Sequence, residues 1–184
     1  MKIATIGKGN VGGGLADLWE KAGHEVQRLG SDGGDVSGAE AVLLAVPFGA
    51  IEDALKGVSG LEGKTLIDAT NFFGEERRPG GLESLAAYVK QVSGANVAKA
   101  FNTIFAALHD QVGEQRVPPS CLYCGEDAAK ETTAQLIRDA GYDPVDAGGL
   151  ESARVLEDFL RLSMAVSNAG LGRSFYRFAR PGEL

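Results

Sequence analysis

Three glycines near the start of the chain have a spacing that suits phosphate binding. Gly7, Gly9 and Gly12 form the pattern G-x-G-x-x-G between an apolar segment, 2–6, and a predicted helix. Gly7 lets the chain turn sharply, Gly9 leaves room for a pyrophosphate, and Gly12 lets the helix pack closely on the strand. The unpaired N–H groups and positive dipole end of the helix would face the phosphates. We predict a dinucleotide-binding turn; the alternative is a glycine-rich turn without a ligand.

Residues near the end of the second predicted strand bear on the choice between NAD and NADP. Asp32 follows Gly12 by 20 positions, which is typical of a carboxylate that binds the ribose 2′-hydroxyl of NAD. Lys8, Arg28 and Ser31 instead offer cationic and hydroxyl groups that suit the 2′-phosphate of NADP. These side chains could also be ordinary surface groups beside a loop. The spacing alone leaves the choice open.

The cysteines and histidines are too few to indicate a metal centre. Cys121 and Cys124 form one C-x-x-C pattern, and the chain has two histidines, His24 and His109. A redox pair or half a zinc site is one interpretation of that pattern, but positions three apart in a strand point to opposite faces. We therefore expect reduced structural thiols and a cytoplasmic location, and we interpret His24 as structural.

No nucleophilic triad or metal-ligand spacing can be placed at one site. Hydride transfer between two bound cofactors fits this pattern, because the protein then mainly positions rings and excludes water. Acyl transfer and hydrolysis fit it poorly.

Composition places the chain among globular domains. It has 184 residues, 44% of them hydrophobic, and a net charge of -7. We expect a single domain over 1–184, with a C-terminal extension at about 150–184. The acidic balance argues against nucleic acid and anionic membranes as partners. We also expect no transmembrane helix and no secretory signal, since no long apolar run is present and the N-terminus leads directly into a strand.

Strand and helix patterns alternate along the chain. Strands are predicted at 2–6, 24–29, 41–46, 64–68, 96–101, 120–124 and 142–146. Helices are predicted at 11–21, 48–55, 82–91, 104–109, 126–140 and 151–169, with a further helical turn in 171–178. Segment 30–40 is too rich in glycine for the usual crossover helix, so a loop is expected there. The alternation predicts an α/β fold: a Rossmann-type doubly wound parallel sheet with a short helical C-terminal extension.

Ligands of such a sheet bind beyond the carboxyl ends of its strands. Four groups of residues should meet there, at 7–11, 30–32, 46–48, and 69–72 together with 102–106. The first should hold the pyrophosphate and the second the adenine ribose. The last two should surround the nicotinamide and its reaction partner.

Several motifs, taken in order, resemble one known family. They are Gly-Lys-Gly-Asn-Val-Gly at 7–12, Ala-Gly-His-Glu-Val at 22–26, Leu-Ala-Val-Pro at 44–47, Asp-Ala-Thr-Asn at 68–71, Val-Ala-Lys-Ala-Phe-Asn-Thr at 97–103, and the segment 146–157 that begins Asp-Ala-Gly-Gly-Leu. Together they resemble the NADPH-dependent F-420 reductase family (reduced coenzyme F-420:NADP oxidoreductase), over nearly the whole chain. The cytoplasmic domains of the STEAP metalloreductases are more distantly similar.

The resemblance implies NADP on the glycine turn and direct hydride transfer to a deazaflavin ring set against the nicotinamide. The implied pyrophosphate contacts are Gly7, Gly9, Asn10, Val11 and Gly12. Lys8 falls near the 2′-phosphate, and Ser31 matches a family serine in Gly-Ser-Arg, whereas Asp32 stands in place of the arginine.

The resemblance also implies the walls around the two rings. The nicotinamide walls are Val46, Pro47, Phe48 and residues Ile104 to Ala106, with the Ala106 N–H holding the carboxamide. Phe105 stands where the family commonly has proline. The deazaflavin candidates, by position, are Asn71, Phe72 and Asn102. Phe72 and Phe73 could stack on a tricyclic ring, and Arg77 and Arg78 could contact an acidic tail; ordinary packing or surface roles are the alternatives.

Three functional hypotheses follow. The first is an oxidoreductase that moves hydride between NADP(H), or NAD(H), and coenzyme F-420 or a flavin. The second is a dinucleotide-binding sensor without chemistry. The third is a small dehydrogenase that resembles pyrroline-carboxylate reductases, although those carry a longer helical dimerisation domain. A homodimer is expected from the family and from the apolar helix at 151–169.

Overall fold

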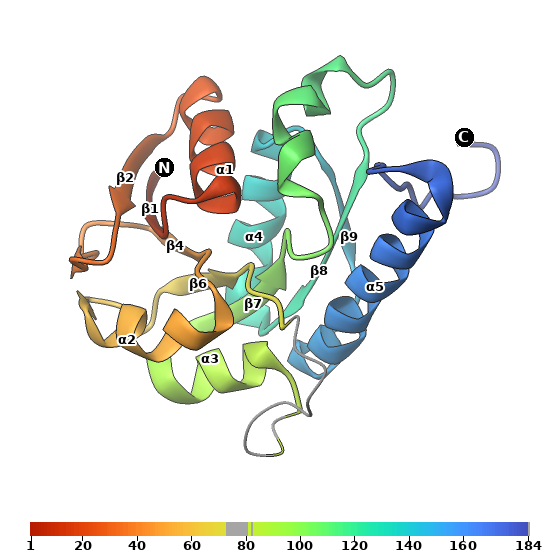
Figure 1. The fold of residues 1–184 in the computed structure, drawn as a ribbon. Helices are drawn as coiled ribbons and strands as arrows, with labels where there is room; N and C mark the ends of the chain where they lie inside the picture. Colours follow the sequence, from red (N-terminus) through yellow and green to blue (C-terminus); the bar gives the residue numbers. More distant parts are fainter. Residues whose placement is uncertain (73–80, 82, 184) are drawn as a thin grey trace.

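A computed structural model describes residues 1–72, 81 and 83–183, which form a three-layer α/β/α arrangement (Figure 1). The strands are β1 (Lys2–Ile6), β2 (Glu25–Leu29), β3 (Gly34–Asp35), β4 (Ala41–Leu44), β5 (Val58–Ser59), β6 (Thr65–Asp68), β7 (Asn96–Ala100), β8 (Ser120–Gly125) and β9 (Asp143–Asp146). The α-helices are α1 (Asn10–Lys21), α2 (Ile51–Lys56), α3 (Leu85–Ser93), α4 (Asp127–Asp139) and α5 (Ala153–Val166). Short 3₁₀ helices are η1 (Phe48–Ala50), η3 (Ala106–Glu114) and η4 (Leu150–Ser152).

The main sheet has the order β2-β1-β4-β6-β7-β8-β9. Its first five strands run parallel, as the sequence predicts. The chain leaves β1 toward β2 on one side and later returns to pair β4 on the other side. The order therefore reverses between β1 and β4, which is where a doubly wound sheet places its ligand crevice.

The sixth predicted strand runs against this direction. β8 is antiparallel to β7, and β9 is parallel to β8, so the prediction of a wholly parallel sheet is wrong at this edge. The reason is the connection: η3 and the residues after it bring the chain back at the carboxyl end of β7, where β8 begins. Gly125 permits the close pairing, because a Cβ at that position would lie 2.7 Å from the Cα of Ala98.

Alternate residues of the central strands point into two separate cores. In β4, Val42 and Leu44 join the core under α2, α3 and α5, whereas Ala41 and Leu43 join the core under α1, η3 and α4. This two-residue period on a sheet buried on both faces fits the continuous apolar run in the sequence. The two helical layers hold the strand ends, and therefore the site, in fixed positions.

Three smaller features differ from the predicted elements. Helix α3 begins at Leu85, three residues later than predicted, because the Ser84 hydroxyl accepts a hydrogen bond from the Ala87 N–H and caps the helix. The predicted loop at 30–40 contains β3, which pairs with β5 in a two-stranded sheet.

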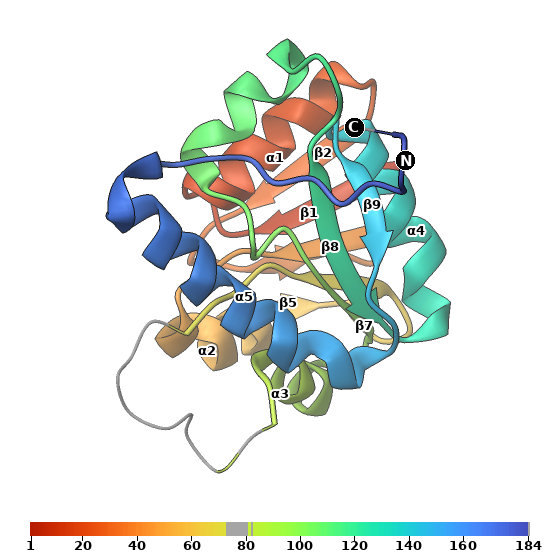
Figure 2. The same cartoon turned by 90° about the vertical axis from the view of Figure 1, so that its right-hand side faces the viewer.

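The helical turn predicted for 171–178 is also wrong. A π-helical turn at Ser167–Leu171 ends the helical region. Residues 173–180 have no regular secondary structure and cross β8 (Figure 2). The Ser120 N–H donates to the Tyr176 carbonyl and the Phe178 N–H donates to the Ser120 hydroxyl. Pairing with a sheet strand thus replaces helix formation in this segment.

In the described part of the chain, no helix combines the length and apolar character required to cross a bilayer.

Candidate functional site

A cavity of about 700 Å³ opens where β1, β4, β6 and β7 end. Eight residues predicted from the sequence line it: Val11, Val46, Pro47, Phe48, Asn71, Asn102, Ile104 and Ala106. Ala69, Thr70, Phe72 and Phe105, which lie in the segments predicted at 69–72 and 102–106, line it as well. The structure adds three residues that were not predicted, Leu160, Met164 and Arg173. The last three come from α5 and the segment after it, so the C-terminal region forms one wall. Its apolar lining is typical of a pocket that encloses a ring system.

A second hollow of about 480 Å³ lies at the start of α1. Its lining includes Lys8, Gly9 and Asn10 from the glycine turn (residues 7–12) and Ala106 and His109 from η3. Ala106 belongs to both hollows, so the two adjoin. We call them the ring cavity and the glycine-turn hollow.

The glycine turn has the geometry that its spacing predicts. Gly7 has φ 108°, and a Cβ there would lie 2.2 Å from the Ala45 carbonyl oxygen. A Cβ on Gly12 would lie 2.1 Å from the Gly7 carbonyl oxygen. Gly9 differs, since nothing lies within 4 Å of its Cβ position, and this N-cap residue makes no side-chain capping bond. The start of α1 thus offers open space and N–H groups without a side-chain cap, which suits an anion.

The two cations near the adenine-ribose end, Lys8 and Arg28, differ in whether they are free to bind a phosphate. The Lys8 Nζ reaches within 3.5 Å of the Cβ position of Gly30, at the end of β2, and no described carboxylate is within ion-pair distance of it. Arg28 instead pairs with Asp17 at 2.7 Å and Glu20 at 2.6 Å. Hydrogen bonds to these carboxylates raise the pKa of the Arg28 guanidinium. Arg28 is therefore already neutralised by α1, whereas Lys8 is not.

Five predicted site residues lie outside the described linings of the ring cavity and the glycine-turn hollow. They are Gly7, Gly12, Arg28, Ser31 and Asp32. The two glycines act through close packing, and Ser31 and Asp32 are exposed in the turn after β2. Phe73, Arg77 and Arg78 lie outside the described residues.

Two asparagines connect β6 and β7 at the ring cavity. The Asn71 amide donates to the Asn102 carbonyl at 2.8 Å, and the Asn102 amide donates to the Asn71 side-chain oxygen at 3.2 Å and to the Leu156 carbonyl at 3.2 Å. Phe72 meets Phe48 edge to face, with ring centroids 5.0 Å apart. The polar pair and the aromatic pair thus each connect two segments of the lining.

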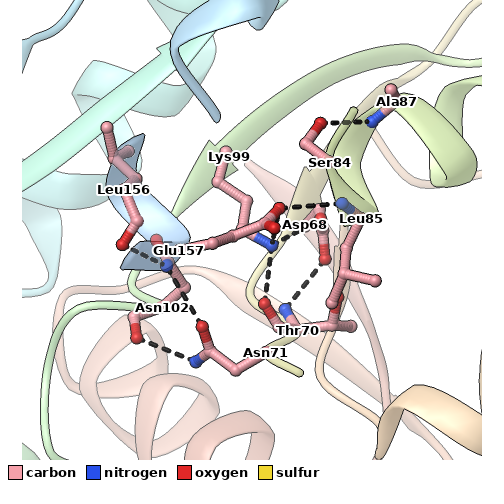
Figure 3. Close-up of polar contacts among 10 residues, drawn as sticks. All are labelled: Asp68, Thr70, Asn71, Ser84, Leu85, Ala87, Lys99, Asn102, Leu156 and Glu157. Carbon is pink, nitrogen blue, oxygen red and sulfur yellow. Dashed lines mark hydrogen bonds and ion pairs between the residues drawn. The ribbon is translucent and has the colours of Figure 1, made fainter. Parts of the chain in front are cut away.

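A buried ion cluster lies next to this lining (Figure 3). The Lys99 ammonium group, fully buried, lies 2.8 Å from Asp68 and 3.4 Å from Glu157, and it donates to the Thr70 carbonyl at 2.6 Å. Asp68 accepts from the Thr70 N–H, and Glu157 accepts from the Leu85 N–H. The cluster ties β6, β7, α3 and α5 together next to Thr70.

Sequence reasoning missed Lys99 and Glu157 as parts of the site. A signal was present: a lysine inside a buried apolar strand needs a carboxylate partner, because an unpaired buried charge is costly. The α5 lining residues Leu160 and Met164 also have a signal, since they follow the buried Leu156 at intervals of four positions.

Phe101 has an unusual backbone conformation at the end of β7. Its φ is 62°, in the left-handed region, and it is the single described non-glycine residue with positive φ. Its ring is held between Trp19, at 5.9 Å, and Tyr142, at 6.3 Å. Such strain costs on the order of 1–3 kcal/mol and persists only where packing imposes it. The strained residue directly precedes Asn102 at the cavity.

The cysteines and histidines have structural environments. Cys121 and Cys124 lie in different cores, on opposite faces of the sheet as predicted, and burial raises the pKa of each thiol to about 12. His24 lies 2.9 Å from Asp139. The His109 Nδ1 lies 2.8 Å from the Tyr142 hydroxyl, and burial lowers its pKa to about 4. Within the described ranges, no His, Cys, Asp or Glu side chains gather in a group able to hold a metal ion.

Comparisons with known proteins agree with this geometry. No family model matches the chain. It is 33% identical over 156 residues to the F420-dependent NADP reductase of Methanothermobacter marburgensis, covering 72% of this chain and 67% of that enzyme. It is 35% identical over 127 residues to metalloreductase STEAP3 of Rattus norvegicus, covering 66% of this chain but 25% of that protein.

Comparison with solved structures shows that the similarity covers nearly the whole fold. A protein from Arthrobacter sp. FB24, named as a candidate F420-dependent NADP reductase, superposes with a TM-score of 0.80 at 27% identity and covers 98% of this chain and 100% of that one. A reductive aminase from Aspergillus terreus, in complex with NADPH, shares the fold with a TM-score of 0.68 at 17% identity. From the extent of the match to the methanogen enzyme, the chain belongs to the F420-dependent NADP reductase family.

Proposed function

We propose that this protein is an NADP(H)-dependent oxidoreductase that exchanges a hydride with coenzyme F-420 or a flavin. The observation that carries the proposal is the pair of adjoining hollows, one at an uncapped helix start and one apolar, which share Ala106. A dinucleotide would span both, with its phosphates at the glycine turn and its nicotinamide in the ring cavity. Membership of the family supports the same assignment.

The proposed dinucleotide contacts follow the placement of the residues. Gly7, Gly9, Asn10, Val11 and Gly12 would form the pyrophosphate cradle. Lys8 would bind the 2′-phosphate, with Ser31 beside it, whereas Arg28 would contribute less because it already pairs with Asp17 and Glu20. Asp32 is the residue that could instead favour NAD.

The ring cavity would perform the transfer by positioning rather than by acid–base chemistry. Bound NADP(H) and the deazaflavin or flavin supply the hydride chemistry. Val46, Pro47, Phe48 and Ile104 would exclude water and hold the nicotinamide, with the Ala106 N–H directed at its carboxamide. Asn71 and Asn102 would border the second ring. A fixed apolar enclosure holds the two rings close together and prevents loss of the hydride to solvent.

Parallel titrations test this proposal. NADPH and NADH are titrated by fluorescence, and absorbance of the reduced nicotinamide is then followed after addition of F-420, FMN, FAD or a ferric chelate. We expect tighter binding of NADPH and bleaching only when F-420 or a flavin is present. Tight NADPH binding without turnover on any acceptor would overturn the proposal and favour a dinucleotide sensor.

We propose a homodimer that associates through the outer face of α5. Val155, Leu162 and Val166 lie on this face and are 66%, 58% and 40% exposed, which is unusual for apolar side chains spaced to form one stripe. Leu162→Glu should convert the dimer to a monomer in sedimentation velocity. Val117→Glu is the control, since Val117 is also exposed (45%) but lies outside α5. An unchanged sedimentation coefficient for Leu162→Glu would exclude this interface.

We also propose that residues 1–184 form one domain in the cytoplasm. Two free, buried thiols, Cys121 and Cys124, support a reducing compartment. Subcellular fractionation of the native host tests the location, and recovery in a periplasmic fraction would contradict it.

A further inference from the structure

The ring cavity has one charged side chain in its described lining. Arg173 contributes that charge, and the other described lining residues are apolar or neutral polar. No described carboxylate pairs with Arg173, in contrast to Arg28 and Arg177, which each have an acidic partner. A guanidinium that no described carboxylate neutralises, at an apolar cavity in a chain of net charge -7, offers a local attraction for an anion.

The backbone holds Arg173 at this place. Just before it, Gly170 and Gly172 have φ 118° and 75°, and these left-handed conformations turn the chain away from the helical region. The Gly172 N–H donates to the Ser167 carbonyl at 3.2 Å, which closes the turn. The turn therefore returns the chain toward the cavity that α5 also lines.

Just after Arg173, the chain is anchored again. The Tyr176 hydroxyl accepts from the Leu122 N–H at 3.1 Å and lies 2.5 Å from the Thr103 hydroxyl. Thr103 stands between Asn102 and Ile104, which both line the ring cavity. The backbone of Arg173 thus lies between a closed turn and an anchor beside the cavity lining, while its side chain is exposed at the cavity.

We propose that Arg173 determines specificity for a phosphorylated co-substrate, by binding the phosphate on the side chain of its tricyclic ring. The inference rests on the proposed function and deepens it. A guanidinium binds phosphate through paired N–H groups, while the apolar walls accept the ring. Arg173 is absent from the described lining of the glycine-turn hollow, where the phosphates of the dinucleotide would lie.

Equilibrium binding to matched ligand pairs tests the assignment without turnover. FMN against riboflavin differs by the phosphate alone, and F-420 is compared with its deazariboflavin, which lacks the phosphate together with the acidic tail; binding is followed by ligand fluorescence at low salt. The variants are Arg173→Gln, Arg173→Lys and the control Arg180→Gln, an exposed arginine of the same segment. NADPH affinity and thermal melting are measured for each variant.

We expect Arg173→Gln to weaken F-420 or FMN at least tenfold, to change the phosphate-free ligands and NADPH less than twofold, and to leave the melting temperature unchanged. Arg173→Lys should recover part of the loss, and added salt should reduce the wild-type preference. Equal losses for both members of a pair, no loss, or a loss confined to NADPH would overturn the inference.

Wild-type turnover separates this inference from the proposed function. Phosphate-selective binding without hydride transfer would overturn the proposed function and leave the role of Arg173 intact. Normal hydride transfer with an unaffected Arg173→Gln variant would overturn the role of Arg173 alone.

Discussion

Lys8 and Arg28 are two cations at the same end of the glycine turn, and they differ in whether carboxylates already neutralise their charge. The side chain of Lys8 extends over Gly30, whereas Arg28 pairs with two carboxylates of α1. A group already paired gains less from a new anion, because it must give up its present partners. At the scale of single residues, discrimination between nucleotides therefore depends mainly on Lys8.

Substitution of these two residues gives the first prediction. Lys8→Ala should weaken NADPH about tenfold or more, since a charge-assisted contact to phosphate is lost, and should change NADH less than twofold. Arg28→Ala is the matched control, with a smaller change for NADPH. Both affinities are measured by fluorescence titration. Equal weakening of NADPH and NADH by Lys8→Ala would contradict a 2′-phosphate contact.

The sequence predicted the positions of these side chains but not their partners. Arg28 was recognisable as a cation at the end of a strand. Its pairing with Asp17 and Glu20 depends on how α1 packs against β2, and no spacing within one element reveals such a contact. The placement of Arg173 at the ring cavity was unpredictable for a similar reason. The helix expected at 171–178 would point the Arg173 side chain in a different direction.

The buried Lys99 gives a prediction about stability. Lys99→Met would leave Asp68 and Glu157 buried without their cation, which should cost about 3–5 kcal/mol in the free energy of unfolding. Replacing all three, as Lys99→Met with Asp68→Asn and Glu157→Gln, should recover part of that loss. Urea denaturation measures both, with the exposed Lys56→Met as a control that should change little. A Lys99→Met variant as stable as the control would show that the cluster is unimportant for folding.

At the scale of elements, the glycine turn contains one glycine that the fold requires and another that only a bound ligand could require. Gly7 is required by the fold because its φ is 108° and a side chain would meet the Ala45 carbonyl. Gly9 has open space at its Cβ position, so the fold itself does not require glycine there. Any requirement at Gly9 must come from a ligand.

This contrast gives a paired test. Gly9→Ala should fold with a nearly unchanged melting temperature but bind NADPH at least tenfold more weakly, since its methyl group would occupy the space for the pyrophosphate. Gly7→Ala should lose stability, on the order of 1–3 kcal/mol or more. Thermal melting and NADPH titration are compared for both variants. Normal NADPH affinity in Gly9→Ala would place the phosphates elsewhere.

Element types were largely predictable, but the direction of one strand was not. Alternating apolar runs and glycine ends indicated every strand of the main sheet. β8 is buried on both faces, so its sequence has no pattern that depends on its direction. The direction of β8 depends on the path of η3, which packs against α1, and such a contact between distant segments leaves no pattern in the local sequence.

At the scale of the whole molecule, His109 links the folded state to pH. Its pKa falls from 6.5 to about 4 in the folded protein because burial disfavours the charged ring. Below pH 6.5 the unfolded chain takes up a proton that the folded chain does not, so stability is lost as pH falls from about 6.5 to 4. The loss can reach about 3 kcal/mol for this one group.

Urea denaturation between pH 7.5 and 4.5 measures this effect. The wild type should lose stability in that range more steeply than a His109→Gln variant, which has no titrating ring. Parallel curves for the two proteins would show that His109 does not titrate differently in the folded and unfolded states.

The ring cavity draws its walls from nearly the full length of the chain, from Val11 to Arg173. The glycine turn, by contrast, is built from neighbours in sequence and from the adjacent strands. Closing distant contacts has a higher entropic cost and is slower than closing local ones. During refolding, the glycine turn that would hold the phosphates should therefore form before the walls of the ring cavity. The order of assembly would then give the chain a phosphate-binding stage that precedes its competence for hydride exchange.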